Sequence, residues 1–300
     1  MADESWRALY PFESHWRQIR GGRYHYLDER QSGEQGMRAP LLMVHGNPTW
    51  SFYWRRLAQA YSPTHRVVVP DHMGCGLSDK PTDYDYCLQT HIDNLVSLID
   101  ELDLQNITLL GHDWGGAIGM GAAVARPDRF SRFVLFNTAA FPPPFFPWRI
   151  RVCRTPIVGR IALQGFNLFS RAALQMAVER AESLPPAVRA GLLAPYDCWS
   201  HRVAVWRFVK DIPASPSHPT YATLQTIESG LQQFSNRRTM LVWGKRDWCF
   251  RPSCMDRFLQ HWPNSDQVCF ENAGHWVIEE EHEGIVQELT KFLAEEESDK

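Results

Sequence analysis

The sequence predicts an α/β fold, with a mostly parallel central sheet flanked by helices and an inserted helical cap. Two patterns in the 300 residues support this prediction. Short apolar runs alternate with segments of helical periodicity, which is typical of parallel strands covered by helices on both faces. The alternation stops near residue 139 and resumes near residue 232. We therefore expect a main domain at 1–138 and 232–300, and a helical cap (lid) domain at 139–231.

The segment before the predicted cap supplies the first elements of the sheet. Residues 16–27 are expected to form two short strands around the turn Gly21-Gly22. Apolar runs predict buried strands, and apolar residues at helical spacing predict the helices between them. The strands are expected at 41–44, 66–70, 107–110 and 133–136, and the helices at 52–61, 88–102 and 117–125.

The expected cap is helical and rich in aromatic residues, and prolines at 142–144 and 147 exclude regular structure at its start. Its aromatic residues are candidates for lining an apolar substrate pocket. They are Phe141, Phe145, Phe146, Trp148, Phe166, Phe169 and Trp199. After the cap, strands are expected at 239–243 and 267–270, and helices at 253–262 and 281–294.

Composition excludes several classes of protein. The net charge of −3 gives no electrostatic basis for binding nucleic acid or an anionic membrane. No run of about 18 apolar residues is present, and residues 1–7 lack the apolar core of a secretory signal. The seven cysteines include no C-x-x-C pair. We therefore expect reduced thiols and a cytoplasmic protein, and the sequence leaves homo-oligomer formation open.

The run Gly111-His112-Asp113-Trp114-Gly115 lies between a buried strand and a helix of small residues. Glycine on both sides of one polar residue in this setting is typical of a nucleophile elbow, which usually carries serine. Asp113 replaces that serine. A carboxylate is ionised at pH 7 and can attack an electrophilic carbon directly, forming an ester on the enzyme. The alternative is that Asp113 only caps the helix.

Two further polar residues follow predicted strands, Asp247 and His275. Catalytic groups of open α/β sheets gather at the carboxyl ends of the strands, and the chain order nucleophile, acid, histidine is that of the α/β-hydrolase triad. We therefore assign Asp113 as nucleophile, His275 as the base that activates water, and Asp247 as the acid that orients His275. Asn137 occupies a rival position for the acid, but an amide cannot ionise.

The loop His45-Gly46-Asn47-Pro48 follows another predicted strand. The backbone N–H groups of Asn47 and Trp114 are candidates for an oxyanion hole beside Asp113. The side chains of both residues also carry N–H donors, which suit a leaving anion such as halide. The alternative is that Trp114 packs in the core and Asn47 forms part of a turn.

These motifs resemble those of the haloalkane dehalogenases of the α/β-hydrolase superfamily, over about residues 12–293. The resemblance implies that Asp113 is the nucleophile, His275 the base, and Asn47 and Trp114 the halide-stabilising pair. Asn47 together with an acid at Asp247 looks like the third subfamily. The implied reaction hydrolyses a carbon–halogen bond to alcohol and halide through an alkyl ester of Asp113. A small apolar substrate (a halogenated alkane or similar electrophile) and water are implied, with no metal or organic cofactor. The motifs that carry the resemblance are His45-Gly46-Asn47-Pro48-Thr49-Trp50, Gly111-His112-Asp113-Trp114-Gly115-Gly116, Trp243-Gly244-Lys245-Arg246-Asp247 and Ala273-Gly274-His275-Trp276.

Two related enzyme classes share much of this pattern. The chain also resembles the β-lactone decarboxylases of bacterial long-chain olefin biosynthesis, which keep the same five residue types, and the motifs do not separate the two activities. Epoxide hydrolases use an aspartate elbow with two cap tyrosines, and the expected cap offers Tyr196 and Tyr221. A ligand-binding receptor with the same fold is a further, non-enzymatic alternative. Such a protein has little need for an intact nucleophile, acid and base, so this sequence favours an enzyme. The substrate's chain length and the preferred halide stay open.

Overall fold

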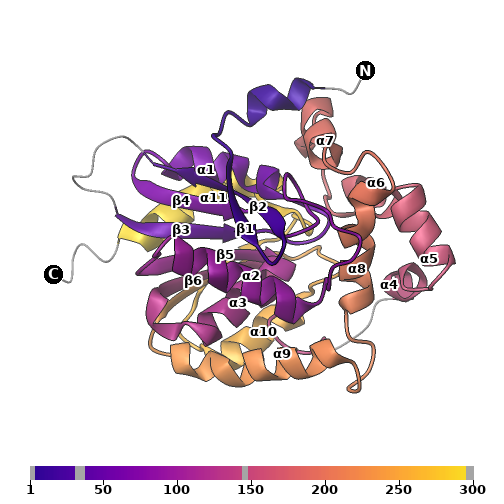
Figure 1. The fold of residues 1–300 in the computed structure, drawn as a ribbon. Helices are drawn as coiled ribbons and strands as arrows, with labels where there is room; N and C mark the ends of the chain where they lie inside the picture. The colour runs from indigo at the N-terminus through magenta and orange to yellow at the C-terminus, as the bar shows by residue number, and fades with distance from the viewer. Residues whose placement is uncertain (1–3, 31–37, 144–147, 295–300) are drawn as a thin grey trace.

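The computed structural model describes residues 4–30, 38–143 and 148–294. Its centre is an eight-stranded sheet in the order β1-β2-β4-β3-β5-β6-β7-β8 (Figure 1). The pairs β1–β2 and β2–β4 are antiparallel, and all other neighbours are parallel. The α/β-hydrolase fold expected from the sequence is confirmed. The strands are β1 His15–Ile19, β2 Gly22–Glu29, β3 Arg38–Val44, β4 His65–Pro70, β5 Ile107–Asp113, β6 Phe130–Thr138, β7 Arg238–Gly244 and β8 Asp266–Phe270.

Helices cover both faces of this sheet. α1 and α11 lie on one face, and α2, α3, α9 and α10 lie on the other (Figure 1). The main helices are α1 Arg55–Tyr61, α2 Leu88–Glu101, α3 Trp114–Ala125, α10 Pro252–His261 and α11 Val277–Ala294. Between β6 and β7 lie α4 Trp148–Cys153, α5 Val158–Arg160, η4 Ile161–Gly165, α6 Leu168–Met176, α7 Pro186–Leu193, α8 Val203–Asp211 and α9 Pro219–Gly230. Short helices complete the fold: η1 Ser5–Leu9, η2 Ser51–Trp54, η3 Pro127–Arg129, η5 Ala181–Ser183, η6 Ser200–Arg202 and η7 Leu231–Phe234.

Two large apolar layers of the core cover the sheet, one on each face, and a smaller third cluster joins α4, η4 and α8. Successive side chains of a strand point to opposite faces, so neighbouring residues belong to different layers. Leu109 packs with the residues of α2 and α3, whereas Leu110 packs with those of α1 and α11. Burial on both faces explains why the central strands are continuous apolar runs in the sequence.

The predicted strands are all present, but most extend beyond the apolar runs that predicted them. β3 begins at Arg38 and β7 at Arg238, because backbone pairing continues where the side chains have become polar. All seven cysteines carry free thiols. Within the described ranges, no helix combines the length and apolar character needed to cross a membrane.

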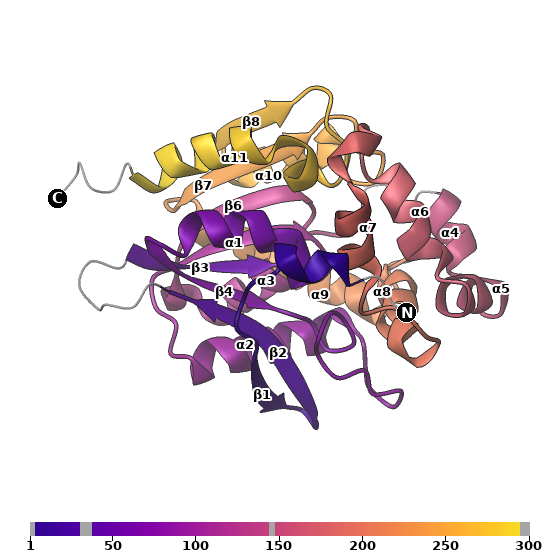
Figure 2. The ribbon, with the colours of Figure 1, turned by 90° about the horizontal axis from the view of Figure 1, so that it is seen from above.

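The helices between β6 and β7 divide into two groups. α4, α5 and α6 stand away from the sheet at one end of the molecule (Figure 2). α9 instead packs on α2 and α3, and its Leu224 and Ile227 join the core layer on that side. The expected domain boundaries at 139 and 231 remain a prediction.

Candidate active site

The turn from β5 into α3 holds Asp113 in a strained conformation. Asp113 is the last residue of β5, and its φ of 54° and ψ of −128° lie outside the regions that residues with side chains favour. A Cβ on Gly115 would overlap the backbone carbonyl of Val44, and one on Gly46 would overlap the Asp113 side chain. Gly46 and Gly115 therefore allow β3, the loop that follows it and α3 to pack closely around the Asp113 carboxylate.

Asp113, His275 and Asp247 form a connected row of side chains at the carboxyl edge of the sheet. Nδ1 of His275 lies 2.8 Å from Oδ2 of Asp247 and donates a hydrogen bond to it. Nε2 of His275 lies 3.5 Å from Oδ2 of Asp113. Asp113 ends β5, Asp247 follows β7 and His275 follows β8, so the parallel topology brings Asp113 next to two residues that are more than 100 positions away in the sequence.

The row favours an ionised Asp113 and a protonated His275. Burial alone raises the pKa of Asp113, but the hydrogen bond and charge of His275 outweigh it and hold that pKa below its ordinary value. Burial alone lowers the pKa of His275, but the carboxylates of Asp247 and Asp113 outweigh it and raise the pKa to about 10. At neutral pH the resting site therefore holds an imidazolium between two carboxylates.

The loop after β3 places Asn47 against Asp113. The Asn47 backbone N–H donates to Oδ1 of Asp113 over 2.8 Å. Its side-chain Nδ2 donates to the carbonyl of Val205 in α8 over 3.3 Å, while Oδ1 is buried without a hydrogen-bond partner among the described residues. Trp114 begins α3, so its backbone N–H has no acceptor within the helix. Its ring packs against Phe208 with centroids 5.5 Å apart.

Asn137 is a member of the site that the sequence suggested only as a rival acid. It is fully buried at the end of β6, and its Nδ2 donates to Oδ2 of Asp247 over 3.0 Å. The Cys249 N–H donates to the other Asp247 oxygen over 2.6 Å. Asp247 thus accepts bonds from three directions and is fixed in front of His275. The sequence did contain a signal for this role of Asn137, because Asn137 is a polar residue at the end of a buried apolar strand.

Two apolar cavities meet at Asp113. The smaller has a volume of about 120 Å³ and lies toward Trp114, Val209 and Leu224. The larger has a volume of about 420 Å³ and lies toward His275, α4, η4 and α6. The residues that border both cavities are Asn47, Asp113, Ile150, Phe169 and Cys249. An apolar ligand with two arms can therefore place its branch point at the carboxylate.

The aromatic residues expected to line the pocket behave differently from one another. Phe141 lines the smaller cavity and Phe169 lines both. Trp148, Phe166 and Trp199 are instead exposed, by 71%, 66% and 44%, and they line neither cavity. Phe145 and Phe146 lie outside the described residues.

The two tyrosines of the expected cap do not line the cavities at Asp113. Tyr196 is buried and its hydroxyl donates to the carbonyl of Thr49 over 3.2 Å. Neither Tyr196 nor Tyr221 borders the described lining of the two cavities. The arrangement therefore gives no support to an epoxide hydrolase, which needs two phenols directed at the substrate oxygen.

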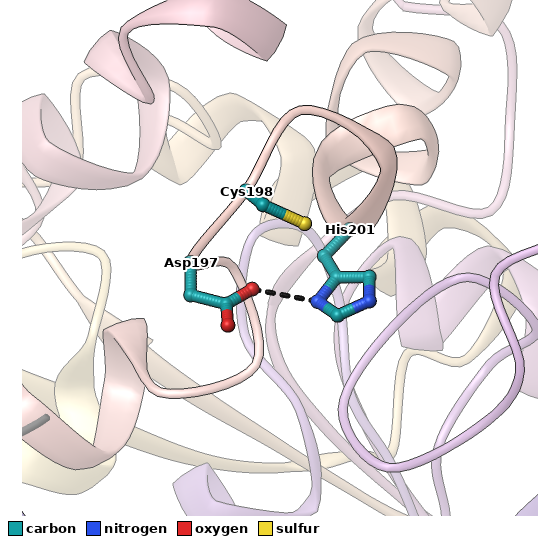
Figure 3. Close-up of side chains that lie close together, drawn as sticks. All are labelled: Asp197, Cys198 and His201. Carbon is teal, nitrogen blue, oxygen red and sulfur yellow. Dashed lines mark hydrogen bonds and ion pairs between the residues drawn. The ribbon is translucent and has the colours of Figure 1, made fainter.

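Among the described residues, three potential metal ligands gather at one surface turn: Asp197, Cys198 and His201. Figure 3 shows Asp197 and His201 pointing toward each other, and Nδ1 of His201 lies 2.6 Å from Oδ1 of Asp197. All three are exposed and none borders the cavities at Asp113. The direct pairing of His201 with Asp197 is enough to explain why these side chains lie close together.

Comparison with known proteins agrees with this geometry. The family model of the alpha/beta hydrolase fold matches residues 39–151. A Shewanella oneidensis protein named cis-3-alkyl-4-alkyloxetan-2-one decarboxylase is 39% identical, covering 97% of this chain and 91% of the relative. Haloalkane dehalogenase 2 of Mycobacterium bovis is 33% identical, covering 91% of this chain and 92% of that protein.

The solved structures include similar enzymes as well. The haloalkane dehalogenase DatA of Agrobacterium tumefaciens superposes with a TM-score of 0.83 at 25% identity, covering 94% of this chain and 96% of that one. Similarity to named relatives thus extends over nearly the whole chain. The chain therefore belongs to the haloalkane dehalogenase-like family of α/β hydrolases.

Proposed function

We propose that this protein is a β-lactone decarboxylase, acting on oxetan-2-ones that carry alkyl chains on ring carbons 3 and 4. The observation that carries the proposal is the pair of apolar cavities meeting at Asp113. A cis-disubstituted β-lactone has two apolar chains on neighbouring carbons, with the reactive ring between them. The relative that is 39% identical bears the name of this activity, whereas the haloalkane dehalogenase named above is 33% identical.

The first step follows from an ionised carboxylate in an apolar site. Oδ2 of Asp113 attacks ring carbon 4 from the side opposite the ring oxygen, and the bond between carbon 4 and that oxygen breaks. The electron pair of the broken bond goes to the oxygen, which becomes part of a free carboxylate on carbon 3. Asp113 is then an alkyl ester, and Oδ1 remains beside the Asn47 N–H.

The second step returns the enzyme to its starting state. The bond from carbon 3 to the carboxylate breaks and releases CO₂, and its electron pair forms the double bond between carbons 3 and 4. The bond from carbon 4 to Asp113 breaks with its electrons, so Asp113 leaves as a carboxylate. The His275 imidazolium stabilises this developing charge, and the apolar cavities favour loss of a charged carboxylate. Inversion at carbon 4 followed by anti elimination gives a cis alkene, and no water is consumed.

Haloalkane dehalogenation is the second candidate, and the position of Asn47 and Trp114 beside Asp113 favours it. The first step would be the same attack, with halide as leaving group and N–H donors stabilising it. The ester would then be hydrolysed. Esterification removes the negative charge of Asp113, so the pKa of His275 falls and a neutral imidazole can activate water.

Turnover of matched substrates by the purified protein tests the proposal. The panel contains a cis-3,4-dialkyl β-lactone, a 1-bromoalkane of similar chain length and styrene oxide. The products measured are alkene from the lactone, bromide from the bromoalkane and diol from the epoxide. We expect alkene and CO₂ from the lactone at a specificity constant at least tenfold above that for bromide release. Bromide release without alkene would instead establish the dehalogenase, and diol release alone would contradict both.

A further inference from the structure

Positive charge is concentrated in one segment of the cap. Residues 148–178 contain five arginines and no lysine, aspartate or glutamate, although the whole chain has a net charge of −3. Arg149, Arg151, Arg160 and Arg171 are exposed, and none has a carboxylate partner among the ion pairs of the described residues. The net charge of the whole chain predicted no affinity for an anionic membrane. That net charge does not show that residues 148–178 are locally positive.

The same segment exposes large apolar side chains. Ile157 is 73% exposed, Trp148 71%, Val158 67% and Phe166 66%. Trp148 lies on α4 and Val158 on α5, Ile157 directly precedes α5, and Phe166 directly follows η4. α4 and α5 lie away from the sheet in both ribbon views (Figures 1 and 2). We call the exposed side of residues 148–171 the cap face. Exposed apolar groups gathered in this way mark an interaction surface.

The larger cavity reaches this surface. Arg149, Val152 and Leu168 are exposed on the cap face and also line the larger cavity, which continues inward to Asp113. The guanidinium of Arg149 lies 5.5 Å from the ring of Trp248, at the edge of the cavity lining. An apolar molecule on the cap face therefore has an apolar route to the nucleophile.

We propose that the cap face docks on an anionic lipid bilayer and that the larger cavity opens into it. Arginines interspersed with tryptophan, phenylalanine and aliphatic residues are the composition that inserts at a membrane interface, with the cations at the lipid phosphates. Nucleic acid would leave the apolar side chains without a partner. The docking on the bilayer does not depend on the proposed function. The entry route does depend on it, because it assumes a dialkyl β-lactone substrate that partitions into lipid.

Flotation with vesicles tests the docking without any substrate, so its outcome is independent of the proposed reaction. The vesicles are phosphatidylcholine alone, or phosphatidylcholine with phosphatidylglycerol, at low and high salt. We expect the protein to bind the anionic vesicles and to be released by salt. Each arginine near an anionic surface contributes about a fivefold factor in binding. The double charge reversal Arg151→Glu with Arg171→Glu should therefore weaken binding by about 25-fold or more.

Two further variants separate docking from general charge. Ile157→Ser with Val158→Ser should weaken binding and leave salt dependence in place, since it removes only the apolar contribution. Arg30→Glu with Arg237→Glu changes the same total charge at the opposite edge of the sheet and should bind like the parent. Equal binding by the parent and the Arg151→Glu, Arg171→Glu variant would overturn the proposal. So would an oligomer that lacks vesicle binding and dissociates when Ile157 and Val158 become serine, because a second copy would then cover the cap face.

Discussion

The two sides of the cavity at Asp113 differ in how they are built. On the main-domain side, Asp113, His275 and Asp247 are polar, buried and fixed by hydrogen bonds from the ends of separate strands. On the cap side, Ile150 and Phe169 offer only apolar surface. We expect the fixed polar row to set the reaction and the apolar wall of helices to set which substrates fit. Reaction type and substrate size should then depend on different parts of the chain.

The strongest test of this division is removal of the nucleophile. Asp113→Ala should reduce turnover of every substrate by at least about 10⁴-fold, because no other group can form the ester. The variant should still fold, since the carboxylate lies at the edge of the core rather than within it. Steady-state kinetics and a thermal melt measure both effects, with Asp197→Ala as an exposed aspartate control. Residual turnover above a few per cent would exclude Asp113 as nucleophile.

Removal of the histidine separates the two candidate reactions on the main-domain side. His275→Phe leaves Asp113 able to attack, but water loses its base, a loss of about 10²–10⁴-fold in hydrolysis. A bromoalkane should therefore leave a stable alkyl adduct on the protein, visible by intact-protein mass spectrometry. The β-lactone should still release alkene at a reduced rate, because its second step needs no water. Continued bromide release without an adduct would contradict the role of His275.

Loss of an N–H donor should have a smaller effect and depend on the leaving group. Asn47→Ala and Trp114→Phe each remove a side-chain N–H donor from a residue that lines the smaller cavity together with Asp113. If that donor stabilises the leaving anion, its loss should cost about 10²-fold in rate, as in comparable anion sites. Bromoalkane turnover and bromide binding, followed by tryptophan fluorescence quenching, should both weaken. Lactone turnover should change less, since its leaving oxygen stays attached to the substrate. Unchanged bromide kinetics in both variants would assign these two side chains to packing.

The sequence predicted the main domain better than the cap, for a physical reason. Buried parallel strands need continuous apolar runs, and the elbow needs Gly115, so these features are visible residue by residue. The sequence of a helix shows that one face is apolar but does not show which part of the protein that face packs against. Trp148 and Phe166, for example, were expected to line the pocket but are exposed and line neither cavity, and α9 packs on α2 and α3 although it lies within the range expected to form the cap.

The site shows the same contrast between local and long-range information. The approach of Asp113, Asp247 and His275 follows from their positions after parallel strands, a regular rule of the fold. The bond from Asn137 to Asp247 depends on side-chain direction at the end of β6, which no spacing rule specifies. The two cavities depend on how α4, α6 and α8 pack, so their volumes could be obtained only from the structure.

The smallest expected effects come from the cap side and concern chain length. Ala173 lines the larger cavity and Ala139 the smaller one, so Ala173→Leu and Ala139→Leu place the same added volume in different cavities. Excluding about two methylenes of substrate from burial costs about 1.6 kcal/mol, or roughly tenfold in the specificity constant. Each variant should lose this factor only for lactones whose long chain occupies the filled cavity.

Four β-lactones complete the measurement, with a long or a short chain at carbon 3 and at carbon 4. Ala222→Leu, on the exposed side of α9, is the matched control and should leave all four specificity constants unchanged. If each cavity holds one chain, Ala173→Leu and Ala139→Leu will discriminate against opposite isomers, and together they will disfavour the lactone with two long chains by about 10²-fold, because independent losses add as free energies. If both variants instead discriminate against the same isomer, the two cavities act as one channel, and the cap side selects total length rather than the position of the chains.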